Sequence, residues 1–170
     1  MVTTVVNDPG LVVGDVLDWT GAETFSAVVP SAALSKGDIL KKDASTDPDS
    51  YSETTATTNI AGPFVMVLQD KASGITHASV VRGGTWACVA DGNIEFGDDV
   101  MLSANTDHQV QKLTALDTTA TLSESTVETA INYYKFKIGV SEGFADSYKT
   151  GSQVKAVDGD LVAVNTNRGY

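Results

Sequence analysis

The chain has 170 residues, one cysteine and a formal net charge of −11, with a pI near 4.3. This length suits one domain or two small fused halves, and a lone cysteine excludes an intramolecular disulfide. The acidic balance argues against polyanionic partners such as nucleic acid or an anionic membrane surface.

Residues 1–34 are expected to form an N-terminal arm or the first strands. The start of the chain lacks the positive region and the long apolar core of a secretory signal peptide. Thr3-Thr4-Val5-Val6 alternates weakly and could add as a strand to a sheet edge on a partner. Trp19 and Phe25 are the large aromatic residues of this segment and could serve as apolar anchors. The candidate contact residues are therefore Thr3, Thr4, Val5, Val6, Trp19 and Phe25. The alternative is that this segment is simply the first strand pair of the core.

A short phrase recurs along the chain: glycine, aspartate and then an apolar pair. Three copies begin at Gly14, Gly37 and Gly159, and a fourth copy at Gly97 carries one extra aspartate. Glycine permits a positive φ, and aspartate can bond its own backbone in a turn. The phrase predicts a tight turn followed by a strand at each of the four places.

Period-two alternation predicts strands between these turns. The predicted strands are Phe64 to Leu68, Thr85 to Ala90, Lys135 to Val140 and Leu161 to Val164. The first and the last of these are almost fully apolar and are expected to be central strands. Many short strands punctuated by Gly/Asp turns indicate an all-β fold, either a compact β-sandwich or a partly open β-barrel. We expect at least about eight strands and less than about 15% helix.

The order of these features predicts an internal repeat inside a β domain of residues 35–170, with halves at 35–95 and 96–170. Each half carries a polar insert rich in Ser and Thr, which is typical of a surface loop. The second insert also predicts one short helix within Ser125 to Tyr134. Its first residues have capping-box spacing, and apolar side chains then share one face.

No arrangement of residues in the sequence predicts catalysis. His77 and His108 are far apart and have no fixed partner, and a Ser-His-Asp set can be composed on paper from any chain with this many serines. Cys88 lies on an alternating strand and is interpreted as a small buried hydrophobe. We therefore expect no enzyme activity, no catalytic residue and no cofactor.

One acidic stretch has the spacing of a calcium loop. Asp43, Ser45, Asp47 and Asp49 are two residues apart, but Pro48 occupies the position where an EF-hand needs glycine. We interpret the stretch as a solvated acidic loop and predict no metal site. A weak calcium site there remains an open alternative.

The order of turns and strands resembles the small capsid cement, or decoration, proteins of tailed viruses. The matching stretches are Lys36 to Leu40, Val80 to Trp86, Ile138 to Glu142 and Val157 to Val164. The resemblance covers roughly residues 35–165, but neither the first 34 residues nor the two polar inserts. It implies a virion protein that is made in the host cytoplasm and binds the outer capsid surface. It also implies a homotrimer that stabilises contacts between major capsid proteins.

Other functions stay open at this stage. The main alternative is a carbohydrate- or receptor-binding β module of a viral fibre or surface structure, which exposed aromatic platforms would favour. A small hydrolase and a tail-tube or baseplate subunit are further alternatives. The physical character of the chain agrees with a structural virion role, because an acidic protein stays off the packaged genome and stays soluble before assembly.

Overall fold

The computed structural model describes residues 11–43, 50–53, 63–113, 123–124, 127–128, 131, 137–145 and 155–168. The protein is 51% strand and 6% helix, which confirms the all-β prediction and the low helix content. The described strands are β1 (Val16–Asp18), β2 (Glu23–Val28), β3 (Ile39–Lys42), β4 (Tyr51–Glu53), β5 (Phe64–Val67), β6 (His77–Arg82), β7 (Thr85–Val89), β8 (Ile94–Glu95), β9 (Asp99–Leu102), β10 (Val110–Lys112), β11 (Lys137–Phe144), β12 (Lys155–Ala156) and β13 (Leu161–Asn165). A 3-10 helix, η2 (Thr166–Arg168), follows β13. Within the described ranges, no helix is both long and apolar enough to cross a membrane.

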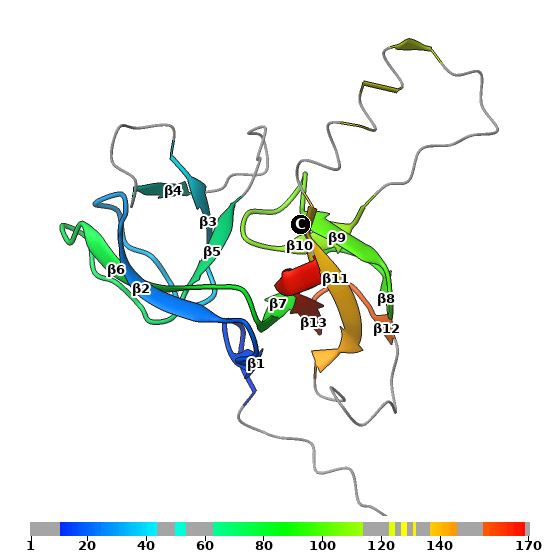
Figure 1. Cartoon of the computed structure of the whole chain (residues 1–170), viewed down its shortest axis with the longest axis horizontal. Helices are drawn as coiled ribbons and strands as arrows, with labels where there is room; N and C mark the ends of the chain where they lie inside the picture. Colours follow the sequence, from blue (N-terminus) through cyan, green and yellow to red (C-terminus); the bar gives the residue numbers. More distant parts are fainter. Residues whose placement is uncertain are drawn as a thin grey trace, which may run out of the picture.

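The strands form two curled antiparallel sheets that stand beside one another (Figure 1). The first is five-stranded, in the order β2-β6-β5-β3-β4, and the second is six-stranded, in the order β1-β7-β13-β11-β9-β10. A separate two-stranded ribbon pairs β12 with β8. The strands predicted from alternation are found as β5, β7, β11 and β13.

The two sheets repeat one topology. If the strands are taken in chain order, β2, β3, β4, β5 and β6 occupy the same places in the first sheet as β7, β9, β10, β11 and β13 in the second. Each sheet also curls so that a parallel bridge joins two strands that are not neighbours in the sheet order. In the five-stranded sheet, Val28 at the end of β2 pairs with Ser50 just before β4. In the six-stranded sheet, Ala90 just after β7 pairs with Val110 of β10. The strand order thus repeats over residues 23–82 and 85–165. The division into halves at 35–95 and 96–170 stays a prediction.

The four Gly-Asp phrases form four equivalent turns. In each, the aspartate N–H donates to the carbonyl three residues earlier at 3.0–3.2 Å, and the aspartate Oδ2 accepts the N–H of that same residue at 2.8–3.0 Å. The glycine has a φ between 83° and 92°, as the third position of a type II turn requires. The turns span 12–15, 35–38, 95–98 and 157–160.

Each turn also forms two backbone hydrogen bonds with one residue in or next to a strand elsewhere in the chain. The glycine N–H donates to the carbonyl of that residue, and the N–H of that residue donates to the aspartate carbonyl, with all distances between 2.8 and 2.9 Å. The turns of residues 12–15, 35–38, 95–98 and 157–160 bond in this way to Ala87, Val67, Ser141 and Ala90, respectively. The phrase therefore fixes a strand pairing as well as a reversal, which explains why it recurs in so β-rich a chain.

One apolar core joins the two sheets. It combines Ile39 and Met66 of the five-stranded sheet with Trp86, Val100 and other buried side chains of the six-stranded sheet. A second cluster, including Leu40, Val65 and Val80, fills the inside of the five-stranded sheet. Because β5 contributes to both clusters, all four of its residues are buried.

The described part of the N-terminal segment belongs to both sheets. β1 pairs with β7 at the edge of the six-stranded sheet, and β2 pairs with β6 at the edge of the five-stranded sheet. Leu11 and Leu17 pack against a small cluster around Ala87 and Ala163. This covering explains why β7 is buried on both faces, although alternation by itself predicts only one buried face.

The predicted short helix falls largely outside the described residues. Val127, Glu128 and Ile131, within the predicted range, are helical, and the N–H of Val127 donates to the carbonyl of Ser123 at 3.1 Å. This spacing of four residues is that of an α-helix.

Candidate functional site

The candidate contact residues of the N-terminal segment fall into three groups. Thr3, Thr4, Val5 and Val6 lie outside the described residues. Trp19 follows β1 in a turn that closes when Ala22 N–H donates to its carbonyl at 3.0 Å, and 55% of Trp19 is exposed. Phe25 lies on β2, half-buried, with its ring centroid 6.0 Å from that of Tyr51. Trp19 thus offers an apolar surface to solvent, whereas Phe25 is partly occupied by packing within the chain.

The ring of Phe25 lies at the seam where the five-stranded sheet curls on itself. β2 and β4 are the two edges of this sheet, and the bridge between Val28 and Ser50 brings them together. Tyr51 of β4, with a relative exposure of only 4%, therefore meets Phe25 of β2. The two rings are tilted at 50°, an arrangement within the range that aromatic pairs prefer.

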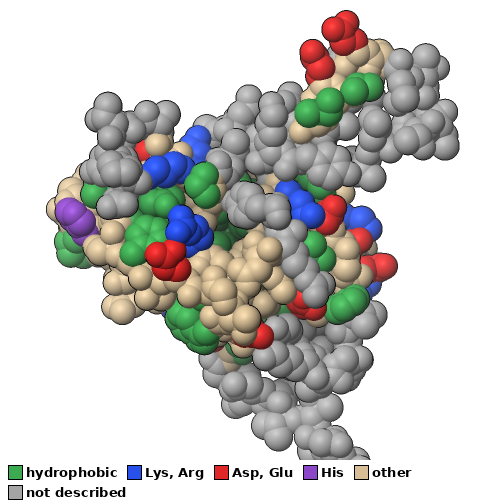
Figure 2. Space-filling model, in the orientation of Figure 1, with side chains coloured by type: hydrophobic (Ala, Val, Ile, Leu, Met, Phe, Trp, Pro, Cys, Tyr) green, Lys and Arg blue, Asp and Glu red, His purple; other side chains and the backbone are tan. Residues whose placement is uncertain are grey.

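An open cavity of about 340 Å³ lies over these rings, and we refer to it as the seam cavity. The described residues that line it combine aromatic rings, cations, a carboxylate, a serine hydroxyl and a proline. They are Phe25, Tyr51, Lys42, Arg82, Glu23, Ser26 and Pro63. Figure 2 shows basic, acidic and hydrophobic side chains gathered on the left-hand lobe, over β2 and β6.

Cross-strand register places the charges of the seam cavity. Glu23 and Arg82 are direct partners on β2 and β6, and their side chains form an ion pair. The Arg82 guanidinium also lies 5.8 Å from the centroid of Phe25. Lys42 is the direct partner of Tyr51, and its Nζ lies 4.8 Å from the centre of that ring. Both distances are within the range of cation–π attraction.

The Lys42 ammonium is buried and has no hydrogen-bond partner among the described residues. Lys71, between β5 and β6, shows how a buried ammonium is satisfied elsewhere in the chain: its Nζ donates to the carbonyls of Ala32 and Ile75. A buried donor without a partner costs free energy, more so when it is charged. The aromatic face of Tyr51 compensates only part of this cost, so the Lys42 ammonium is a position where an anion would be favoured.

A second cavity, of about 270 Å³, lies on the other side of the Glu23–Arg82 ion pair, and both residues line it as well. Its other walls include Trp86, Ile138 and Asn167 of the six-stranded sheet and of η2. Asn167 bonds both neighbouring turns, since its Oδ1 accepts Gly84 N–H at 3.1 Å and its Nδ2 donates to Thr20 carbonyl at 2.6 Å. The Asn167 side chain is thereby hydrogen-bonded within the chain on both its oxygen and its nitrogen.

Both histidines form hydrogen bonds within the chain. His77 is exposed and shares a hydrogen bond of 3.2 Å with the Thr76 hydroxyl. His108 has a φ of 60°, and its Nδ1 accepts the N–H of Ile39 at 3.3 Å. Its Nε2 lies 3.9 Å from Asp38 Oδ1. His108 thus ties the loop between β9 and β10 to the other sheet.

Metal-binding residues are not gathered in the described ranges, where no group of three or more His, Cys, Asp or Glu side chains could hold an ion. Of the acidic stretch with calcium-loop spacing, only Asp43 is described. Cys88 is buried and free of any disulfide, and burial raises the pKa of its thiol to about 12. Such a thiol carries almost no thiolate at neutral pH and is a poor nucleophile.

The sequence singled out Phe25 as a capsid or subunit contact, and it indicated none of the other residues that line the seam cavity. Lys42 and Tyr51 are nine residues apart, across an insert that looked only polar, and Arg82 lies in another strand altogether. Their meeting depends on the strand register and on the closure of the sheet.

Comparisons with known proteins identify no family. No family model matches the chain, and no curated protein matches it. Among solved structures, the chain is similar to the N base of the head fibre gp8.5 of bacteriophage phi29, with 14% sequence identity and a TM-score of 0.49. The match covers 85% of this chain and 93% of that chain. Likeness at this level decides neither family nor activity.

Proposed function

We propose that this chain is a structural virion protein that binds the outer surface of an icosahedral capsid and stabilises contacts between major capsid proteins. The observation that carries the proposal is the exposed Trp19, on the turn that follows edge strand β1. The sequence resemblance to capsid cement proteins supplies the class of partner. Trp19 lies in the segment for which that resemblance gave no counterpart, and where attachment is expected.

Two features of this edge suit attachment. An exposed indole is a typical interface anchor, and burying the exposed half of a Trp side chain removes on the order of 100 Å² from water, or about 2.5 kcal/mol. Strand β1 pairs with β7 on one side only, among the described strands. Its other side can accept a strand from a capsid subunit by β-augmentation.

The proposed role requires only modest contacts at each site. A partner that binds the assembled shell and not the separated subunits stabilises the shell by its binding free energy, at every copy. The formal charge of −11 disfavours binding to the packaged genome. Neither catalysis nor a cofactor enters this proposal.

We propose further that the protein acts as a homotrimer on the capsid exterior after synthesis in the host cytoplasm. Trimerisation would cover sheet edges, which are otherwise exposed to unwanted pairing. Multi-angle light scattering of the free protein, and mass measurement of decorated particles, test this state. A monomer in both measurements would overturn it.

The test of capsid binding compares two surface variants. Trp19→Ala removes the proposed anchor, whereas Ile75→Ala removes a side chain of similar exposure, 50%, from the loop before β6. On particles stripped of this protein, we expect Trp19→Ala to weaken binding at least about tenfold, or about 1.4 kcal/mol, and Ile75→Ala to bind normally. Equal binding by both variants, with unchanged melting transitions, would refute the anchor.

A ligand-binding β module is the second candidate function. The seam cavity favours it, because aromatic rings and polar groups converge there. This candidate does not exclude capsid attachment, since Trp19 is not among the residues that line the cavity.

A further inference from the structure

We propose that the seam cavity binds an acidic saccharide, with the sugar carboxylate at Lys42 and the sugar ring against Phe25. This inference rests on the second candidate function above and names its ligand class. It does not depend on capsid attachment, which is assigned to a different surface.

The described charged residues of the cavity favour a ligand with one negative group. Arg82 is already paired with Glu23, whereas the Lys42 ammonium is buried and lacks a hydrogen-bond partner in the described part of the chain. A carboxylate that reaches Lys42 gains a charge-assisted hydrogen bond in a partly water-excluded place, where such bonds are strong. The site therefore selects for one anionic group at that end.

The carboxylate of Glu23 limits the total negative charge of the ligand and favours a ligand with hydrogen-bond donors. It lines the same cavity as Lys42, and it repels ligands that carry several negative charges, such as a phosphate monoester or a sulfated polymer. A carboxylate is a hydrogen-bond acceptor only, so it favours a ligand that offers hydroxyl donors. The Ser26 hydroxyl adds a group that can donate or accept.

The aromatic walls suit a sugar ring. Phe25, half-buried and supported from behind by the buried Tyr51, presents apolar surface beside the polar groups. The C–H faces of a pyranose are apolar in the same way. A volume of about 340 Å³ is at the lower end of ligand cavities and suits one or two sugar rings. A ligand with one carboxylate, several hydroxyls and an apolar ring face meets all these conditions, and a uronic acid is the simplest such molecule.

The experiment titrates the full chain with methyl glucuronide by isothermal titration calorimetry. Methyl glucoside is the matched neutral probe, because it differs only in a hydroxymethyl group where the glucuronide has a carboxylate. Sodium acetate is the probe for a bare anion. We expect the glucuronide to bind in the roughly millimolar range that one ring and one charge allow, and both other probes to bind at least tenfold more weakly. Equal binding of acetate would overturn the saccharide assignment, and equal binding of glucoside would overturn the role of the charge.

Two lysine variants locate the site. Lys42→Met removes the buried ammonium but keeps most of its volume, and Lys41→Met makes the same charge change on the opposite face of β3. We expect Lys42→Met to lower the affinity for glucuronide at least tenfold and Lys41→Met to change it less than twofold. Equal affinities for the two variants would overturn the proposal.

Chemical-shift mapping on the wild-type protein keeps the proposal testable if Lys42→Met does not fold. Saturating glucuronide should move the amide resonances of β2 and β4 near Phe25 and Tyr51. Shifts confined to other strands, or no binding of glucuronide at all, would refute the site. Binding of Lys42→Met to stripped particles separates the two functions, because it should equal that of wild type even where sugar binding is lost.

Discussion

Gly14 and Gly37, each the third residue of a Gly-Asp turn, lie in direct backbone contact. A Cβ atom built on Gly14 would stand 2.5 Å from the backbone nitrogen of Gly37. The first of these turns forms two backbone hydrogen bonds with Ala87 of the six-stranded sheet, and the second forms two with Val67 of the five-stranded sheet. The contact therefore joins the two sheets through glycine backbones, and no other residue type fits there.

Alanine at Gly14 is expected to be strongly destabilising. It adds a Cβ to a residue with φ of 83°, which costs about 1 kcal/mol, and the clash with Gly37 adds about 1–3 kcal/mol. Gly159→Ala is the matched control, because Gly159 has a φ of 84° in an equivalent turn but has nothing within 4 Å of its Cβ position. Urea unfolding should show a loss of about 2–4 kcal/mol for Gly14→Ala and only about 1 kcal/mol for Gly159→Ala. Similar losses would mean that the turn contact does not hold the sheets together.

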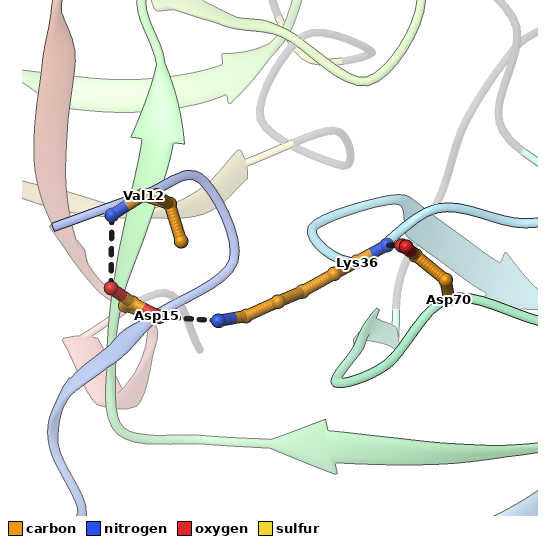
Figure 3. A network of polar contacts seen from close by, with 4 residues as sticks. All are labelled: Val12, Asp15, Lys36 and Asp70. Carbon is orange, nitrogen blue, oxygen red and sulfur yellow. Dashed lines mark hydrogen bonds and ion pairs between the residues drawn. The ribbon is translucent and has the colours of Figure 1, made fainter. Parts of the chain in front are cut away.

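An ion pair spans the same contact between the two turns. The Asp15 carboxylate accepts Val12 N–H at 2.9 Å and the Lys36 ammonium, while Lys36 N–H donates to Asp70 Oδ1 at 2.8 Å (Figure 3). Burial alone would raise the pKa of Asp15. The hydrogen bonds from Lys36 and Val12, together with the Lys36 charge, outweigh burial and hold the pKa below its ordinary 3.8. Folding therefore favours the ionised form of this carboxyl.

A double-mutant cycle of Asp15→Asn and Lys36→Met should show a pH-dependent coupling. A lowered folded pKa means that the stabilisation is complete well above pH 3.8 and is lost as the pH falls through the lowered value. Both side chains are about one-third exposed, so we expect a coupling of only about 0.5–1 kcal/mol at neutral pH. Urea titrations at pH 7 and in acid measure it. A coupling that grows on acidification would contradict the assigned role of the pair.

Sequence patterns predicted what is local in this fold. The four turns follow from residue chemistry within four positions, and strands such as β5 and β13 follow from short apolar runs. What could not be predicted is non-local: that β4 meets β2, or that Leu17 would cover the outer face of β7. Phe25 illustrates the limit, because its apolar character was evident but its burial against Tyr51 depends on the closure of the sheet.

Lys42 shows the same limit for the candidate site. A lysine at the end of a strand ordinarily keeps its ammonium in water, and nothing in the neighbouring sequence marks this one as buried. Its placement over Tyr51 results from the pairing of β3 with β4. Reading such a site from sequence would require the register of the sheet, which a single sequence does not contain.

Cys88 is expected to be inert towards thiol reagents in the folded protein. Its side chain is 2% exposed, and burial raises the pKa of the thiol from 9.0 to about 12. At pH 8 this alone lowers the thiolate fraction roughly a thousandfold. Ellman's reagent should therefore react with the native protein at least about a thousandfold more slowly than with the protein in strong denaturant. Stoichiometric labelling of the native protein within seconds would show that β7 is not buried in solution.

Removal of residues 1–8 is expected to separate attachment from folding. The first described contacts of the chain begin at Leu11, which packs on Ala87 and Ala163, and at the turn of residues 12–15. Because the deletion spares both, the melting temperature should stay within about 2 °C of the full chain. Binding to stripped particles should nevertheless be lost if Thr3 to Val6 add as a strand to a capsid subunit. Normal occupancy of the truncated protein would refute the arm, and outright unfolding would show that these residues belong to the core. Combining the deletion with Trp19→Ala then tests whether the arm and the indole contribute independently, since two independent anchors should have additive effects on the free energy of binding.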